Sequence, residues 1–208
     1  MKAYKKYFDQ ALRLNYPGQA VDYIRETEFL YQGIRADLGF VSSSGNPMDR
    51  RLYISGYFLA LIQVLDRDGK SMEEIRSLVT GIASEYVRPK NKWQAFLKRL
   101  PARLIKSGLA SILLKKMDRM VSRNAHPEGF RVRVLTGKEE TLGFGYGVDI
   151  LECGICKLFA RHGFSKYAAL LCEVDYITSS LAGLQLVRTG TIANGAEQCD
   201  FRFKRTGG

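Results

Sequence analysis

The chain has 208 residues, of which 46% are hydrophobic and 25% are charged, a balance typical of soluble globular proteins. This length allows one sizeable hydrophobic core or two small ones. No apolar run reaches the roughly 18 residues that a membrane-spanning helix needs, and the first ten residues lack the apolar segment of a secretory signal. We therefore expect a cytoplasmic protein, in which cysteines stay reduced and more often bind metal or react than form disulfides.

The net charge of +11 is concentrated in one segment. Residues 88–123 contain eleven Lys or Arg and a single acid, Asp118, so they carry +10 of the total. Such a block can contact an anionic surface, or it can be the solvated face of helices that pack on the protein's own core. The apolar stripe through Trp93 and Leu97 fits both hypotheses. Nucleic-acid binding is not expected, because no recognition motif accompanies the block.

The first 125 residues have the apolar spacing of helices, interrupted by Gly, Pro and Asn turn signals. Ser71 and Glu74 have the spacing of a capping box, which opens a helix. Pro101 is expected to kink or divide the helix of the basic block. Helices are predicted over residues 2–14, 19–38, 48–65, 71–86, 92–106 and 109–123.

The pattern changes after the turn at residues 126–129. Residues 130–135 alternate with period two, and residues 142–150 follow a turn, which predicts a β-hairpin. The class is therefore α+β: an N-terminal helical part packed against a small, mainly antiparallel sheet with two inserted helices. The predicted regions are a helical region at 1–125 and a cysteine-bearing region at 126–208, compatible with one compact domain. The later elements are helices at 154–162 and 165–181, with Ser165 as the cap of the second, and strands at 184–189 and 199–203.

The four cysteines of the chain all lie in the second region, which predicts one shared site: Cys153, Cys156, Cys172 and Cys199. All four could bind one metal, most naturally zinc, because thiolates suit zinc and a tetrahedral site needs four donors. Alternatively, the Cys-x-x-Cys pair at a strand-to-helix junction is a reactive or redox pair, because a helix N-terminus favours a thiolate. Some of the four could also be inert core residues.

Polar residues near the cysteines are candidates for the same site. Carboxylates beside Cys172 and Cys199 could act as general bases, and two arginines on the last strands could hold a substrate carboxylate through bidentate hydrogen bonds. The catalytic candidates are Cys172, Glu173, Asp175 and Asp200, and the substrate-binding candidates are Arg188, Asn194 and Arg202.

Four sequence blocks occur in order in this region: GVDILECGICKLF at 147–159, LCEVDY at 171–176, RTGTIANG at 188–195 and CDFRF at 199–203. Together they resemble the L-2-amino-thiazoline-4-carboxylic acid hydrolase family over about residues 130–204. The resemblance implies hydrolytic opening of a cyclic thiazoline carboxylate to an N-carbamoyl cysteine. The helical first part resembles the family only in its general character.

The implied chemistry needs an activated water and a group that protonates the departing sulfur. A metal-bound hydroxide with Asp175 or Glu173 as base would supply the first, but a catalytic metal needs an open position, so one of Cys172 or Cys199 would then be free. Two alternatives remain open. One is a non-catalytic ligand-sensing or interaction domain whose fold is stabilised by zinc. The other is a thiol-redox protein that uses Cys153 and Cys156.

Overall fold

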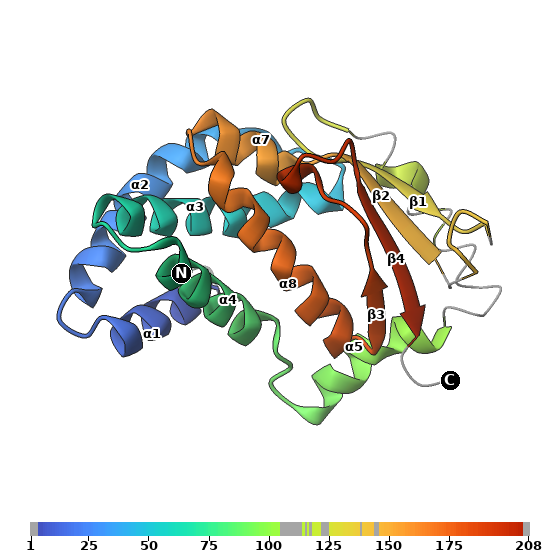
Figure 1. Ribbon diagram of the computed structural model, residues 1–208, viewed down its shortest axis with the longest axis horizontal. Helices are drawn as coiled ribbons and strands as arrows, with labels where there is room; N and C mark the ends of the chain where they lie inside the picture. The colour runs from blue at the N-terminus through green and yellow to red at the C-terminus, as the bar shows by residue number, and fades with distance from the viewer. Residues whose placement is uncertain are drawn as a thin grey trace.

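The computed structural model describes residues 4–104, 114, 116, 118–121, 125–137, 139–143 and 146–205. N-terminal helices form one side of the molecule, and an antiparallel sheet with α7 and α8 forms the other (Figure 1). The predicted α+β class is confirmed. A single hydrophobic cluster includes buried residues from both regions, such as Leu61 of the helical part and Phe159 of the cysteine-bearing part. No helix among the described residues is long and apolar enough to cross a membrane.

The N-terminal helices surround α3, which is buried along most of its length. The predicted capping box at the start of α4 is confirmed, because the Ser71 hydroxyl accepts from the Glu74 N–H and the Glu74 carboxylate accepts from the Ser71 N–H. The helices are α1 (Lys5–Asn15), α2 (Ala20–Asp37), α3 (Arg51–Arg67), α4 (Met72–Val87) and α5 (Lys92–Leu104), with 3-10 turns η1 (Gly39–Ser42) and η2 (Pro47–Arg50) before α3.

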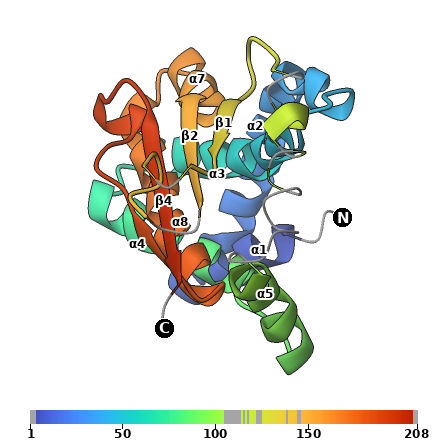
Figure 2. The same cartoon turned by 90° about the vertical axis from the view of Figure 1, so that its right-hand side faces the viewer.

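The basic block begins with α5, which projects beside the C-terminal end of α8 (Figure 2). The helix runs through Pro101, so it is not divided at that residue, and the alternative of a kink there stays a prediction. Proline removes one N–H donor from a helix, and α5 continues despite this loss. Residues 118–121 are helical, and most of the helix predicted at 109–123 lies outside the described residues.

The described sheet has four antiparallel strands in the order β1-β2-β4-β3. The predicted hairpin is confirmed as the β1–β2 pair, and β4 pairs on the other side of β2. Helix α8 packs against β3 and α4 (Figure 1). Ser165 starts a 3-10 turn that makes no side-chain cap, so its predicted capping role is wrong. The elements are β1 (Arg131–Leu135), β2 (Tyr146–Glu152), α7 (Gly154–Arg161), η3 (Ser165–Tyr167), α8 (Ala168–Leu181), β3 (Leu184–Val187), η4 (Ile192–Asn194) and β4 (Cys199–Arg205).

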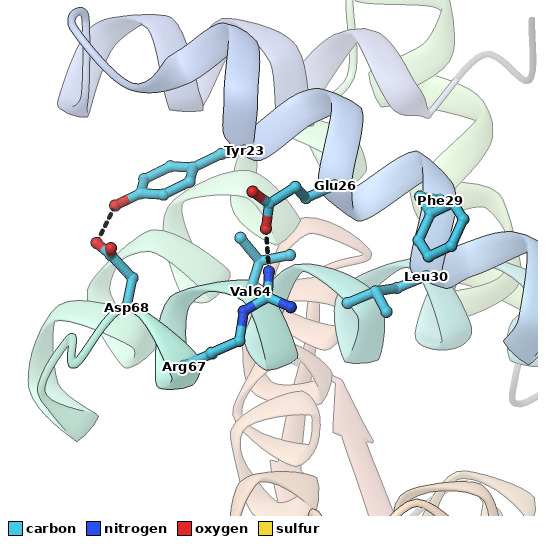
Figure 3. A pocket seen from close by; sticks show the side chains of 7 residues that line it. All are labelled: Tyr23, Glu26, Phe29, Leu30, Val64, Arg67 and Asp68. Atoms are coloured by element: carbon cyan, nitrogen blue, oxygen red, sulfur yellow. Dashed lines mark hydrogen bonds and ion pairs between the residues drawn. The ribbon is translucent and has the colours of Figure 1, made fainter.

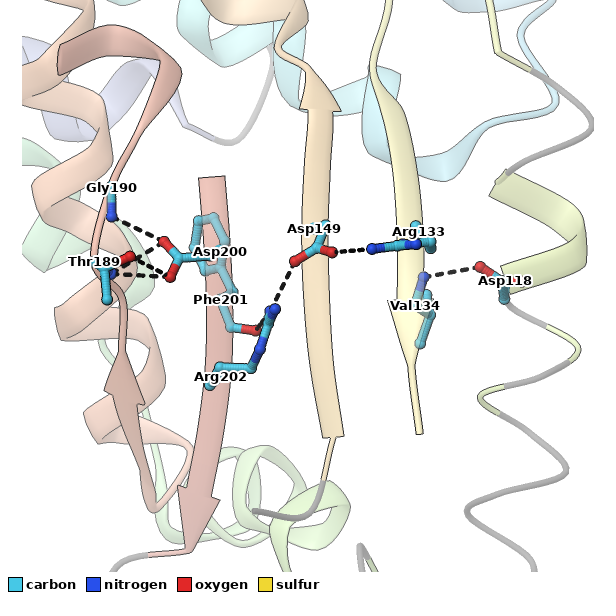
Figure 4. A network of polar contacts seen from close by, with 9 residues as sticks. All are labelled: Asp118, Arg133, Val134, Asp149, Thr189, Gly190, Asp200, Phe201 and Arg202. Atoms are coloured by element: carbon cyan, nitrogen blue, oxygen red, sulfur yellow. Dashed lines mark hydrogen bonds and ion pairs between the residues drawn. The ribbon is translucent and has the colours of Figure 1, made fainter. Parts of the chain in front are cut away.

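One face of the sheet carries a charged network that joins three strands (Figure 4). The carboxylate of Asp149 on β2 is fully buried and accepts from Arg133 on β1 and Arg202 on β4, both at 2.8 Å. At the edge of the sheet, the Asp118 carboxylate accepts from the Val134 N–H at 2.8 Å. These contacts fix the lateral register of the strands and satisfy a backbone donor on the edge strand.

The helical region and the cysteine-bearing region meet at a tightly packed junction near the start of α3. Asp49, which is fully buried, accepts from the Phe130 N–H at 2.9 Å, and the buried Asn46 amide donates to the Phe130 carbonyl, also at 2.9 Å. A Cβ at Gly129 would lie 2.5 Å from the Asp49 carboxylate, and one at Gly154 would lie 3.1 Å from the Gly129 carbonyl carbon. The start of α3, the start of β1 and the start of α7 therefore meet at van der Waals distance.

We expect Asp49→Ala to lower the free energy of unfolding by about 3 kcal/mol, because it leaves the buried Phe130 N–H without its acceptor. Asp49→Asn keeps an oxygen acceptor at the same place and should lose less. Urea unfolding followed by circular dichroism measures both variants. Equal midpoints for the wild type and Asp49→Ala would contradict the assigned role of this junction.

Candidate functional site

The candidate site is a cavity of about 680 Å³ bounded by α3, α4, α7, α8 and the sheet. All four cysteines line it: Cys153, Cys156, Cys172 and Cys199. A second cavity, of about 420 Å³, lies between α2 and α3 (Figure 3). Its polar side chains already pair with one another: Arg67 donates to Glu26, and the Tyr23 hydroxyl donates to Asp68. No cysteine lines this second cavity. The first cavity therefore holds the candidate chemistry.

Cys153 is the residue that precedes the first turn of α7, and Cys156 lies in that turn. Both thiols are free. A hydrogen bond from the Cys156 thiol, with smaller contributions from the N–H groups of Cys156 and Ile155, lowers the pKa of Cys153 to about 7 against the opposing effect of burial. The same hydrogen bond, together with burial, raises the pKa of Cys156. Within the pair, the surroundings therefore favour the thiolate at Cys153 and the protonated thiol at Cys156.

The other two cysteines lie in settings that keep them protonated. Burial, followed by the Asp175 charge, raises the pKa of Cys172 to about 12, and its Sγ lies 4.0 Å from the Ala168 carbonyl one helical turn earlier. Burial also raises the pKa of Cys199, whose Sγ accepts from the Ile192 N–H at 3.3 Å. Cys153 is thus the nucleophile that the local environment favours.

Asp175 on α8 is the carboxylate of the cavity. Burial raises its pKa, while Arg51 and Arg188 oppose the shift. The Arg188 guanidinium lies behind it, 3.4 Å from the Asp175 carboxylate and 3.3 Å from the Cys172 carbonyl, and stacks over Phe201. A carboxyl group with a raised pKa can give a proton to a leaving group and then recover it from water.

The remaining predicted site residues do not line this cavity. Glu173 pairs with Arg76 on α4 at 2.9 Å, and Asn194 is exposed in η4. On β4, Cys199 and Phe201 face the cavity, so strand alternation places Asp200 and Arg202 on the opposite face. There Asp200 accepts from Thr189 and Gly190, and Arg202 donates to Asp149 (Figure 4).

The metal hypothesis finds no ligand set in the described part of the chain. No three Cys, His, Asp or Glu side chains there converge as metal ligands would. The sulfur atoms are engaged locally instead: Cys153 with Cys156, and Cys199 with the Ile192 N–H. The donors present do not fit a four-cysteine zinc site, so the mechanism below uses no metal.

The sequence analysis missed the cationic side of the cavity. Arg50 and Arg51 line it at the start of α3, and Tyr53, Ile54 and Phe58 continue the wall. The Arg51 side chain is 55% exposed and lies 4.0 Å from Asp175, too far for a hydrogen bond. Within the described part of the chain, its donors are therefore available to a ligand. The signal in the sequence was an Arg-Arg pair at the head of an apolar helix.

Comparison with known protein families shows to which family the chain belongs. The model of the family described as L-2-amino-thiazoline-4-carboxylic acid hydrolase matches residues 50–203. The chain belongs to this family. The match begins at Arg50, so it includes Arg50, Arg51 and α3. It therefore starts well before residue 130, where the resemblance seen in the sequence begins. No curated protein and no solved structure matches the chain.

The lowered pKa of Cys153 predicts selective alkylation. Iodoacetamide should label Cys153 first, with a rate that falls as the pH drops below about 7 because the thiolate fraction falls. Cys156→Ala removes the donor and should move the inflection upward by about one to two pH units. Cys156→Ser keeps a donor and should move it less.

Peptide mapping by mass spectrometry across a pH series identifies the labelled thiol. First labelling at Cys172 or Cys199, or an inflection that Cys156→Ala leaves in place, would contradict the assignment.

Proposed function

We propose that the protein is a hydrolase that opens a small cyclic amidine or thiazoline carboxylate, with the thiolate of Cys153 as nucleophile. The observation that carries the proposal is the position of Cys153 at the start of α7, with a lowered pKa, in a cavity that also contains a partly exposed carboxyl group and a half-exposed guanidinium. Membership of the family supports the substrate class.

The reaction proceeds in two halves. The Cys153 thiolate attacks the ring carbon between nitrogen and sulfur, the ring C–S bond breaks, and the departing sulfur takes a proton from Asp175. This leaves an isothiourea bonded to Cys153. Water then attacks the same carbon and gives a proton to Asp175, and the bond to Cys153 breaks. One water is added overall, the product is an N-carbamoyl amino acid with a free thiol, and the enzyme regains its starting state.

Arg51 and Arg188 have different roles in this mechanism. Arg51 binds the substrate carboxylate, because its guanidinium faces the cavity and makes only a distant contact with Asp175. Arg188 is 7% exposed and engaged with Asp175 and a backbone carbonyl, so it is a positioning residue for Asp175.

A thiol-redox protein is the second candidate, favoured by the hydrogen bond between Cys153 and Cys156. A redox role needs both sulfurs, whereas the hydrolase needs one nucleophile and one donor. Cys156→Ser therefore separates the two functions: it abolishes dithiol exchange and preserves most of the hydrolysis. A sensing domain differs from both, because it would bind the heterocycle and leave it intact.

Cys153→Ala should lower turnover of 2-amino-thiazoline-4-carboxylate at least about a thousandfold, because no other group in the cavity is an activated nucleophile. Cys172→Ala removes a thiol from the same cavity and should lose far less. Liquid chromatography with mass spectrometry measures the N-carbamoyl product, and the wild type should also show the isothiourea adduct in quenched samples. Unchanged turnover in Cys153→Ala would refute the mechanism.

Asp175→Asn should lower kcat by about 10²–10⁴-fold, because the amide cannot exchange the proton. Glu173→Gln is the matched control, since Glu173 lies two residues away and pairs with Arg76 outside the cavity. In the wild type, kcat should fall above the raised pKa of Asp175, where the group loses the proton that the departing sulfur needs. Equal loss in both variants would point to a general effect of charge on α8.

Arg51→Met should raise KM by about 10–100-fold with a smaller effect on kcat, because the substrate loses a charge-assisted hydrogen bond. The methyl ester of the same substrate should show little difference between the wild type and this variant. Arg25→Met, on the exposed face of α2, removes the same charge far from the cavity and serves as control. Equal losses for acid and ester would show that Arg51 does not bind the carboxylate.

A further inference from the structure

The cavity is larger than the substrate after which the family is described. Its volume is about 680 Å³, within the range of about 300–1,000 Å³ that encloses drug-sized ligands. A thiazoline carboxylate has about nine non-hydrogen atoms and fills at most about 270 Å³, if each atom takes the volume that a water molecule takes in the liquid. More than half of the space is left over.

The cavity is also longer than one small ring. Its lining residues on α8 run from Ala168 to Thr178, and ten residues of α-helix rise about 15 Å. Cys172 and Asp175 lie inside this span. Since the reacting ring must contact Asp175, the rest of the length is available to another part of a ligand.

The wall along α3 changes from cationic to apolar. Arg51 and Phe58 are separated by seven residues, so they lie on the same face of the helix about 10 Å apart, with Ile54 between them. Helix α4 adds Ala83 and Val87 to the wall. Charged groups therefore gather near Arg51 and Asp175, while most of the remaining wall consists of aliphatic and aromatic side chains.

We propose that the substrate is an amphiphilic acid, namely a thiazoline or cyclic amidine carboxylate that carries an alkyl or aryl substituent able to fill the apolar part of the cavity. This inference rests on the proposed function for the identity of the reacting ring. The apolar wall contributes binding energy in proportion to the hydrocarbon area that it removes from water. The unsubstituted ring leaves that wall uncovered and binds weakly.

The test uses 2-(alkylamino)-thiazoline-4-carboxylates with alkyl groups from methyl to octyl. Calorimetric titration into the Cys153→Ser protein measures binding without turnover. The dissociation constant should fall by about fourfold for each methylene that becomes buried, until the apolar part of the cavity is full. A dissociation constant that stays flat or rises with chain length overturns the proposal.

A cavity-filling variant locates the effect. Ala83→Leu should flatten the dependence on chain length and leave binding of the unsubstituted ring unchanged. Val87→Phe tests the same wall from a partly exposed position, so it keeps the experiment decisive if the buried Ala83→Leu fails to fold. An unaltered chain-length dependence in the folded variants overturns the proposal.

Failure of this inference is distinguishable from failure of the hydrolase. Steep chain-length dependence without turnover by the wild type would support the apolar site and reject the hydrolase. Turnover of the unsubstituted ring with no gain from longer chains would support the hydrolase and reject the larger substrate.

Discussion

The contact on which the site depends is the close meeting of Asp49, Gly129 and Gly154. The Asp49 carboxylate holds the Phe130 N–H at 2.9 Å, and neither glycine has room for a Cβ without moving its neighbours. A Cβ at Gly154 would also lie 3.2 Å from the Leu52 side chain of α3. Because Gly154 follows Cys153 and Leu52 follows Arg51, this packing sets the distance between the Cys153 thiol and the cationic wall.

The surroundings in the cavity shift the pKa values of its titratable side chains in different directions. Hydrogen bonding lowers the pKa of Cys153 to about 7, and burial raises those of Cys172, Cys199 and Asp175. The proposed nucleophile and the proposed proton donor are therefore side chains whose pKa values move toward each other. Pairs of groups whose pKa values are displaced in this way are typical of acid–base sites.

Much of the fold could be predicted from the sequence because its signals are local. The capping box at Ser71 and the alternation at 130–135 depend on residues a few positions apart. The site was only half predictable. Strand alternation in the sequence already implies that Cys199 and Asp200 face opposite sides of the sheet. Both were nevertheless predicted as site residues, because they are adjacent in the chain. The place of Arg51 at the cavity depends on the packing of α3 against α7, which no local pattern encodes.

The starts of α3 and α7 meet at the cavity, but they contribute to it in different ways. Helix α3 begins at Arg51 and α7 begins at Gly154, and the contact between Leu52 and Gly154 brings these ends together. At α7 the N–H groups of Ile155 and Cys156 lower the pKa of the Cys153 thiol, whereas at α3 the Arg51 N–H already donates to carbonyl groups of η2. The start of α7 therefore favours the Cys153 thiolate, and in the proposed mechanism the Arg51 side chain, not the backbone of α3, binds the substrate carboxylate. A wall that is otherwise apolar strengthens both effects, because less water screens the charges. The same low polarity that raises the pKa of Asp175 therefore strengthens the effect of the α7 N-terminus and of the Arg51 charge.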